Sequence, residues 1–209
     1  MLINIYIFLL KAFNKVLFML YGLFAGIFTW NRMTVNKVRY GKGFKSNGIP
    51  VIHVKKSGTF KIGMNFTMNN GKYYNQIGRQ QPCYFIVGAN SHLDIGNNVG
   101  ISATAIVCME KITIEDNVKI GGNTVIYDTD FHSLDANDRM EEVENKSRIL
   151  TKPVLIKRNA FIGAHATILK GVTVGENSII GAGSVVSKNI PDNEIWGGNP
   201  AKFIRNTVK

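Results

Sequence analysis

The chain has 209 residues, of which 45% are hydrophobic, and its formal net charge at pH 7 is +11. This length allows one domain of ordinary size with an appendage, and the hydrophobic content excludes a disordered chain. The basic excess leaves three partners open: a phosphorylated ligand, an anionic membrane surface or nucleic acid. Because neither the helical motifs nor the aromatic-studded basic strands that read nucleic acid are visible, we predict no nucleic-acid partner.

The first 30 residues are rich in Leu, Ile and Phe and predict one long apolar helix, which we assign to residues 1–35. The uninterrupted apolar run from Val16 to Trp30 is shorter than the about 20 residues that a membrane span needs. Three arrangements stay open: a helix in the membrane interface, a helix packed on the body or on a neighbouring subunit, and a true span. The basic residues that follow favour a membrane-facing side: Arg32, Lys37, Arg39, Lys42, Lys45, Lys55 and Lys56.

Residues 36–205 are predicted to form the body of the protein, followed by a short tail at 206–209. Apolar residues recur at a step of six in two registers, one starting at Val87 and the other at Ile95. In this interpretation Ala105 and Val107 belong to the repeat, and an extra residue lies within 108–111 before the pattern resumes. The pattern weakens upstream, through a polar segment at 69–81, as expected where an atypical end coil caps a stack.

The repeat stops at Tyr127 and restarts near Val154, so that about residues 128–152 are predicted to form a protruding loop. A long excursion from an otherwise tight fold is usually either functional or disordered. His132 lies between aspartates at the start of this loop, which favours a function.

The clearest repeat runs from residue 156 to residue 186, where a branched apolar residue recurs every six positions: Ile156, Ile162, Ile168, Val174, Ile180 and Val186. This period fits neither a helix nor an alternating strand. It predicts an all-β fold, a parallel β-helix of hexapeptide repeats that places one apolar side chain inward on each flat side. Because such a solenoid cannot bury every face when a loop projects from one corner, we expect a cyclic homotrimer.

The cysteines, Cys83 and Cys108, both lie in apolar, strand-like surroundings. Two cysteines do not make a disulfide framework, so we predict two buried, reduced thiols. A nucleophilic Cys108 is the alternative. The low cysteine content, together with the lack of a cleavable export signal, favours a reducing cytoplasm.

Three segments resemble the hexapeptide-repeat O-acyltransferases: the loop DTDFHSLD at 128–135, the restart FIGA at 161–164 and the ending WGGNPAKFIR at 196–205. The resemblance covers about residues 86–205. It is nearest to the sugar acetyltransferases, which include the maltose and galactoside enzymes and those that modify surface polysaccharides. It implies a left-handed parallel β-helix and direct acetyl transfer from acetyl-CoA to a hydroxyl, with no metal and no covalent intermediate.

The resemblance also implies roles for individual residues. His132 matches the catalytic histidine, and Asp130 and Asp128 are the nearest candidates to orient its ring, with a backbone carbonyl as the alternative. The positions that match the acetyl-CoA-binding surface are Phe161, Gly163, Ala164, Ala182, Ser187, Lys188 and Arg205. The asparagine and the acidic residue that the maltose and galactoside enzymes use on the acceptor are not reproduced, which leaves Ser102 and Glu110, with Asp128, as substrate-binding candidates.

The chemistry required of these residues follows from the reaction. A sugar hydroxyl is a poor nucleophile at neutral pH, so a base must take its proton as it attacks the thioester. Histidine suits this role, because one ring nitrogen accepts the proton while a carboxylate or a carbonyl holds the other. Of the remaining histidines, His165 is either a site residue or structural, whereas His53 and His92 are assigned structural roles. The spacing of a three-ligand zinc site is missing, so no metal is predicted.

The leading hypothesis is an acetyl-CoA-dependent O-acetyltransferase that modifies a carbohydrate in surface-polysaccharide biosynthesis. It would be cytoplasmic, at the inner face of the membrane, with residues 1–30 as a peripheral membrane contact. One alternative is the acetylation of a streptogramin-type antibiotic, and another is a non-catalytic solenoid scaffold. The sequence leaves open the acceptor hydroxyl, the exact acyl group, the contact of the helix with lipid and the group that orients His132.

Overall fold

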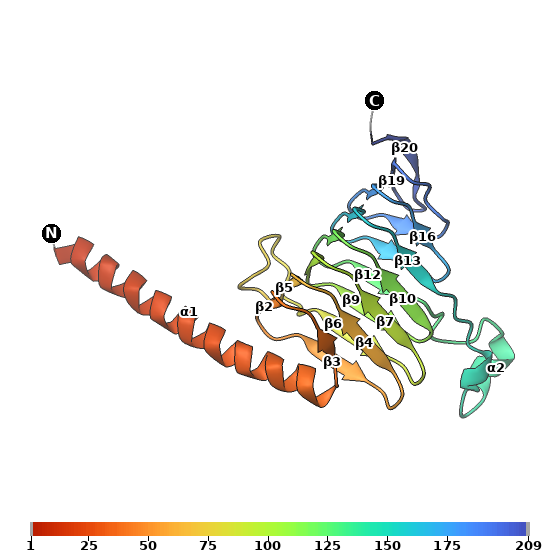
Figure 1. The fold of residues 1–209 in the computed structure, drawn as a ribbon, viewed down its shortest axis with the longest axis horizontal. Helices are drawn as coiled ribbons and strands as arrows, with labels where there is room; N and C mark the ends of the chain where they lie inside the picture. The colour runs from red at the N-terminus through yellow and green to blue at the C-terminus, as the bar shows by residue number, and fades with distance from the viewer. Residues whose placement is uncertain (1, 208–209) are drawn as a thin grey trace.

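The computed structural model describes residues 2–207, most of which lie in or between short parallel strands (Figure 1). The strands stack into three sheets, called here sheets A, B and C. Sheet A contains β1 (Arg39–Tyr40), β4 (Thr59–Ile62), β7 (His92–Ile95), β10 (Lys111–Ile114), β13 (Val154–Ile156) and β16 (Thr173–Val174). Sheet B contains β2 (Lys45–Asn47), β5 (Thr67–Asn69), β8 (Gly100–Ser102), β11 (Lys119–Ile120), β14 (Phe161–Ile162), β17 (Ile179–Ile180), β19 (Glu194–Gly197) and β20 (Lys202–Asn206). Sheet C contains β3 (Val51–Val54), β6 (Tyr84–Val87), β9 (Ala105–Cys108), β12 (Val125–Tyr127), β15 (Thr167–Ile168) and β18 (Val185–Val186).

The chain visits the three sheets in turn, so that each coil of the solenoid contributes one strand to each side. Strands β7, β8 and β9 form one such coil, and β10 begins the next coil in parallel register with β7. Among the pairings between the named strands of the described residues, only the last, β19 with β20, is antiparallel. The fold is therefore mostly β, and its parallel sheets fit the predicted left-handed β-helix.

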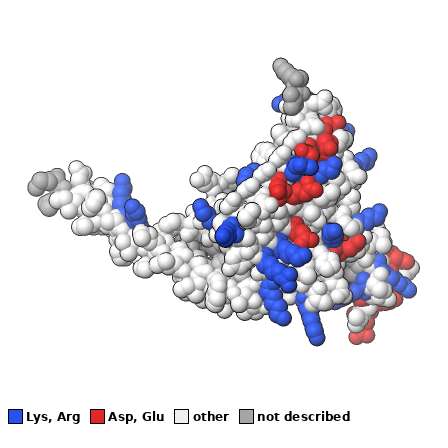
Figure 2. Space-filling view, viewed as in Figure 1, with Lys and Arg blue, Asp and Glu red and all other residues white. Residues whose placement is uncertain are grey.

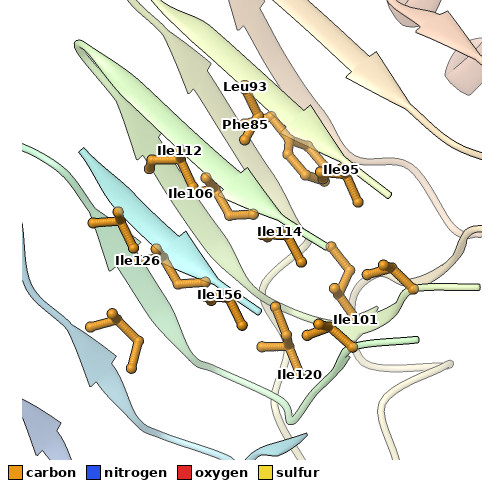
Figure 3. Close-up of a cluster of buried hydrophobic side chains, with 14 of the residues drawn as sticks. Phe85, Leu93, Ile95, Ile101, Ile106, Ile112, Ile114, Ile120, Ile126 and Ile156 are labelled. Atoms are coloured by element: carbon orange, nitrogen blue, oxygen red, sulfur yellow. The ribbon is translucent and has the colours of Figure 1, made fainter. Parts of the chain in front are cut away.

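The core is a column of branched side chains that point inward from all three sheets (Figure 3). The six residues of the repeat from residue 156 to residue 186 are all fully buried, as predicted: Ile156, Ile162, Ile168, Val174, Ile180 and Val186. Burial of one such side chain contributes about 1.5–3 kcal/mol. The repeat therefore stabilises the stack one coil at a time.

The predicted inward residues of β9, Ala105 and Val107, are wrong. Ile106 and Cys108 are fully buried, whereas Ala105 and Val107 are only half-buried. Ile101 and Ile106 are five residues apart, whereas their partners Ile120 and Ile126 are six apart, so the corner before β9, where Ala103 has a φ of +43°, is the shorter one. Ile106 and Ile114 are eight residues apart, against six for the equivalent Ile168 and Val174, so the additional length lies after Ile106, in the stretch that includes the predicted residues 108–111. A corner can absorb an extra residue, whereas an insertion within a strand would turn its inward side chains outward.

A column of asparagines, not predicted from the sequence, runs along the corner between sheets A and B. Its members have φ between +56° and +63°, a region that asparagine tolerates better than most residues: Asn65, Asn98, Asn117, Asn159, Asn177 and Asn193. Each side-chain amide except that of Asn193, the last in the column, donates to the asparagine side chain in the next coil, at 2.9–3.0 Å. The column therefore supplies both the backbone shape and the polar contacts of this corner.

Helix α1 (Leu2–Val35) runs across the N-terminal end of the stack and extends beyond its side (Figure 1). A narrow stripe of α1 packs on the first coil, where Ala25, Thr29 and Met33 are buried. The hydroxyl of Thr29 donates to the carbonyl of Gly48 at 3.3 Å, and Arg32 donates to the carbonyl of Pro50. Packing of the helix on the body is thus present, and α1 caps the end of the core.

The rest of the circumference of α1 is apolar and exposed, for example at Leu23 (68%) and Ile27 (65%). Within the described residues, α1 is the one helix that is long and apolar enough to cross a membrane, with a mean hydropathy of 1.6 over the qualifying window of Ile3–Val35. By length and composition alone, α1 therefore meets the requirement for a span.

Cys83 and Cys108 are fully buried and free, as predicted. Burial raises the pKa of each thiol to about 12, and the nearby carboxylate of Asp128 adds to the shift at Cys108. A thiol with so high a pKa is a poor nucleophile at neutral pH. The structure therefore disfavours the nucleophilic role for Cys108.

Candidate active site

The predicted loop leaves the stack between β12 and β13, at the corner between sheets C and A. An isolated bridge between Thr129 and Thr151 closes its neck. The loop contains the short helix α2 (Ala136–Met140) and a 3-10 turn, η1 (Lys146–Arg148). In Figure 1 it projects from the side of the solenoid.

The side chain of His132 is 70% exposed on this loop, and Glu144 holds one edge of its ring. Nδ1 of His132 lies 2.7 Å from Oε2 of Glu144, and the other carboxylate oxygen accepts the backbone N–H of Ser133 at 2.6 Å. The N–H of Ser133 and the His132 ring together lower the pKa of Glu144. An ionised Glu144 favours the tautomer with the proton on Nδ1, which leaves Nε2 free to act as a base.

A second carboxylate fixes the shape of the loop around this pair. Asp138 is buried, accepts the hydroxyl of Ser133 at 2.7 Å and forms an ion pair with Arg148. The hydrogen bond from Ser133 and then that from Arg148 lower the pKa of Asp138. Because Ser133 bonds to both carboxylates, the position of His132 depends on contacts made within the loop itself.

The two aspartates predicted to orient His132 have other partners. Asp130 lies 2.8 Å from Nζ of Lys170. Asp128 is fully buried and accepts the backbone N–H groups of Met109 (2.7 Å) and Glu110 (2.9 Å); burial raises its pKa. Asp128 therefore braces the neighbouring coil rather than presenting a carboxylate to a substrate, and Glu144 is the carboxylate that contacts the His132 ring.

The other substrate-binding candidates lie at two different corners. Glu110 is half-buried between β9 and β10, at the same sheet C to sheet A corner as the loop. Ser102 ends β8, at the corner between sheets B and C. A single chain therefore does not bring Ser102 together with His132.

The acetyl-CoA candidates are likewise divided. Phe161 is exposed on β14, and Gly163, Ala164 and Ala182 follow β14 and β17 along the corner between sheets B and C. The N–H of Gly163 donates to the carbonyl of Ile180 at 2.7 Å, whereas the N–H of the adjacent Ala164 has no acceptor among residues 2–207. A Cβ on Gly163 would lie 2.5 Å from the backbone nitrogen of Ala182, so this corner requires glycine there.

The remaining candidates are exposed and lie near the C-terminal end of the stack. Ser187 and Lys188 follow β18 at the corner between sheets C and A, and Arg205 lies on β20. His165 occupies a left-handed corner position with a φ of +62°. Its ring lies 3.0 Å from Nδ2 of Asn123 and 3.4 Å from Nε of Arg79, so it has a structural contact beside the Ala164 corner.

Sequence reasoning missed Glu144, Lys170 and Arg79. Glu144 lies in a charged run with other acidic residues, and no spacing rule selects it. Among the residues that the structure describes, no group of three or more His, Cys, Asp or Glu side chains could hold a metal ion.

Part of the chain is similar to known proteins. Residues 153–188 match the family described as bacterial transferase hexapeptide (six repeats). The galactoside O-acetyltransferase of Escherichia coli (strain K12) is 36% identical over 126 residues, which cover 60% of this chain and 59% of that enzyme. A solved galactoside acetyltransferase in complex with coenzyme A is 33% identical, with a TM-score of 0.51, over 68% of this chain and 66% of the other.

A maltose O-acetyltransferase from Clostridium difficile 630 shares the fold, with a TM-score of 0.54 and 23% identity over 92% of this chain and 89% of the other. The chain thus spans about three fifths of the length of the first curated relatives, at 59% and 61%. In its three-sided parallel stack, its six-residue repeat and the match over residues 153–188, the chain is similar to the hexapeptide-repeat transferases.

Proposed function

We propose that this protein is an acetyl-CoA-dependent O-acetyltransferase that acetylates a hydroxyl of a carbohydrate. The observation that carries the proposal is the exposed His132 ring, held at Nδ1 by Glu144 with Nε2 free. The relatives support the reaction type, since they include galactoside O-acetyltransferases and a structure with coenzyme A.

In the proposed reaction, Nε2 of His132 takes the proton of the acceptor hydroxyl as its oxygen attacks the thioester carbonyl. The new C–O bond gives a tetrahedral intermediate, which collapses when the C–S bond breaks and the imidazolium returns the proton to the departing sulfur. The ionised Glu144 stabilises the imidazolium between these steps. The products are an acetyl ester and free CoA, with no net proton change.

The negative oxygen of the intermediate needs a donor that is already in position. The Ala164 N–H, free at its corner, is our candidate for this role. The exposed ring of Phe161 would flank the pantetheine arm, and Lys188 and Arg205 would contact the phosphates of CoA. These assignments follow the resemblance to the family and the exposure of each residue.

The division of candidates between corners supports a homotrimer. Ser102 and Ala164 lie along the sheet B to sheet C corner, whereas His132 lies at the sheet C to sheet A corner. Placing these corners of neighbouring copies side by side would complete each site, and a cyclic arrangement repeats that contact. Light scattering on the purified protein tests the assembly state.

We also propose that the protein works at the inner face of the cytoplasmic membrane, on an intermediate of surface-polysaccharide biosynthesis. Figure 2 shows α1 as an almost uncharged rod with one basic patch, while further basic side chains lie on the first coils of the solenoid. Exposed apolar residues beside basic ones suit an anionic bilayer. The double change Leu23→Glu with Ile27→Glu should abolish co-sedimentation with phosphatidylglycerol vesicles.

Leu134→Glu is the control for that experiment, because Leu134 is 69% exposed on the loop rather than on α1. Equal sedimentation of the double α1 variant and the unaltered protein would exclude α1 as the membrane contact.

Release of free thiol from acetyl-CoA, measured against panels of sugars, nucleotide sugars and streptogramin-type antibiotics, tests the reaction. We expect His132→Ala to abolish acceptor-dependent release and His53→Ala, an exposed histidine on β3, to leave it unchanged. Equal rates in the His132 variant would refute the assignment of the base. Turnover of an antibiotic alone would favour the alternative substrate class, and a protein that neither binds CoA nor releases thiol would be a scaffold.

A further inference from the structure

A groove lies between sheet B and the polar segment at residues 70–82, which joins β5 to β6. Its floor consists of the ends of β2, β5 and β8 and the glycines that follow β11. Of the residues assigned roles above, only Ser102 lines it. The segment itself was not explained by the repeat.

The floor of the groove is a row of polar side chains from successive coils. Nδ2 of Asn47 donates to Oδ1 of Asn69 at 2.8 Å, and Nδ2 of Asn69 donates to the hydroxyl oxygen of Ser102 at 3.1 Å. The side-chain carbonyl of Asn47 and the hydroxyl proton of Ser102 have no side-chain partner among the described residues. The row therefore offers one acceptor and one donor at its two ends.

The opposite wall carries aromatic rings and a further amide, Gln76. The ring of Tyr73 is 62% exposed. Tyr74 is held against α1, with its ring centroid 5.2 Å from that of Phe18 and 6.3 Å from that of Tyr21. A fixed aromatic face opposite a row of amides and a hydroxyl suits a ligand with one apolar face and many hydroxyl groups.

Asn75 gives an independent indication of a ligand. This residue is 6% exposed, and its side-chain oxygen accepts the backbone N–H of Ile77 at 3.3 Å. Its Nδ2 is buried without any hydrogen-bond partner, although buried polar groups are normally paired. It lines the groove beside Gly122, where a Cβ would lie 3.2 Å from that nitrogen and 2.6 Å from Cδ1 of Ile77. A ligand oxygen that enters as the exposed Ile77 side chain turns aside would satisfy this donor.

The charge of the groove defines the ligand class. None of its lining residues is charged, although the chain carries a net charge of +11. A phosphate or carboxylate ligand would be expected to find a basic partner. The lining therefore matches a neutral polyhydroxylated ring.

We propose that this groove is the acceptor subsite for a neutral pyranose unit of a saccharide, and that Tyr73, Asn75 and Gln76 determine acceptor specificity. This inference rests on the acetyl transfer proposed above and names the class of its acceptor. Ser102 joins the subsite to the reacting corner, since it ends β8 beside the coils that carry Ala164.

The test combines kinetics with direct binding. Tyr73→Ala and Gln76→Ala should each raise KM for a neutral acceptor about tenfold, with kcat and KM for acetyl-CoA unchanged. Tyr84→Ala is the matched control, because Tyr84 is also an exposed tyrosine but lies on β6 of sheet C. In the His132→Ala protein, saturation-transfer NMR should detect methyl galactopyranoside or methyl glucopyranoside, and the Tyr73 change should remove the signal. Glucuronate and inorganic phosphate should give none.

The outcomes separate this inference from the proposed function. Acetyl transfer with unchanged acceptor KM in both variants would overturn the subsite and leave the reaction standing. Pyranoside binding that depends on Tyr73, without transfer, would support the subsite and remove the reaction. If the variants alter the assembly state measured by light scattering instead of KM, the groove is a contact between copies and the inference fails.

Discussion

Replacement of Glu144 by glutamine tests the central contact of the site. The carboxylate accepts from His132 at 2.7 Å and from Ser133 at 2.6 Å. A glutamine has only one acceptor oxygen, so it can keep one of these bonds, and it loses the charge that stabilises the imidazolium. General base catalysis contributes about 100- to 10,000-fold. Because the ring of His132 is 70% exposed, water replaces part of the lost charge, and we expect kcat to fall roughly 10- to 100-fold.

The assay is thiol release at saturating acetyl-CoA and acceptor, with Glu142→Gln as the control, since Glu142 is exposed on the same loop. The double variant of His132→Ala with Glu144→Gln should be no slower than His132→Ala alone, because Glu144 acts through the ring. The reasoning is refuted if Glu144→Gln keeps full kcat. It is equally refuted if this change lowers the residual rate of the His132 variant by the same factor.

Three further predictions follow from burial and close contacts. Gly163→Ala places a Cβ 2.5 Å from the backbone of the next coil and should lower the free energy of unfolding by about 1–3 kcal/mol. Gly26→Ala, with open space around it on α1, should not lower it, and urea unfolding of both variants checks this difference. Cys83 and Cys108, with pKa values of about 12, should resist iodoacetamide until the protein unfolds, so rapid labelling of the folded protein would contradict their burial. The lowered pKa of Glu144 stabilises the loop at pH values above its ordinary 4.5, and this contribution is lost in acid. Amide protection factors in the loop, corrected for the intrinsic pH dependence of exchange, that are equal above pH 4.5 and in acid would contradict this.

The solenoid was predictable because its energetics repeat. Each coil needs one branched residue that points inward on every side. Such residues therefore recur every six positions in the sequence wherever the strands are regular. The prediction was wrong about which residues of β9 point inward, because apolar residues occupy both faces of Ala105–Cys108. A strand with apolar residues on both faces does not reveal which side chains point inward.

The orienting residue of the histidine was not predictable for a different reason. Asp130 and Asp128 are the nearest acids in sequence, but the chain between them and His132 leads out of the stack. Asp128 therefore stays with the coil that it braces, and the loop returns Glu144 to the ring. Contacts of this kind depend on the path of an irregular loop, which no residue spacing encodes. The groove beside residues 70–82 was not predictable for the same reason. A polar segment has the sequence pattern of a capping coil whether or not it covers a ligand.

The repeat that makes this scaffold stable also limits where chemistry can be placed on it. Inward positions are filled by the core, and corner positions are constrained by backbone shape, as the asparagine column and Gly163 illustrate. A base and its orienting carboxylate on two coils would have to meet at spacings that the stack fixes. Here one loop supplies both His132 and Glu144, and Ser133 ties them to the buried Asp138. The pair is therefore set by contacts within the loop, while the corners of the solenoid are left to supply backbone donors and binding surfaces.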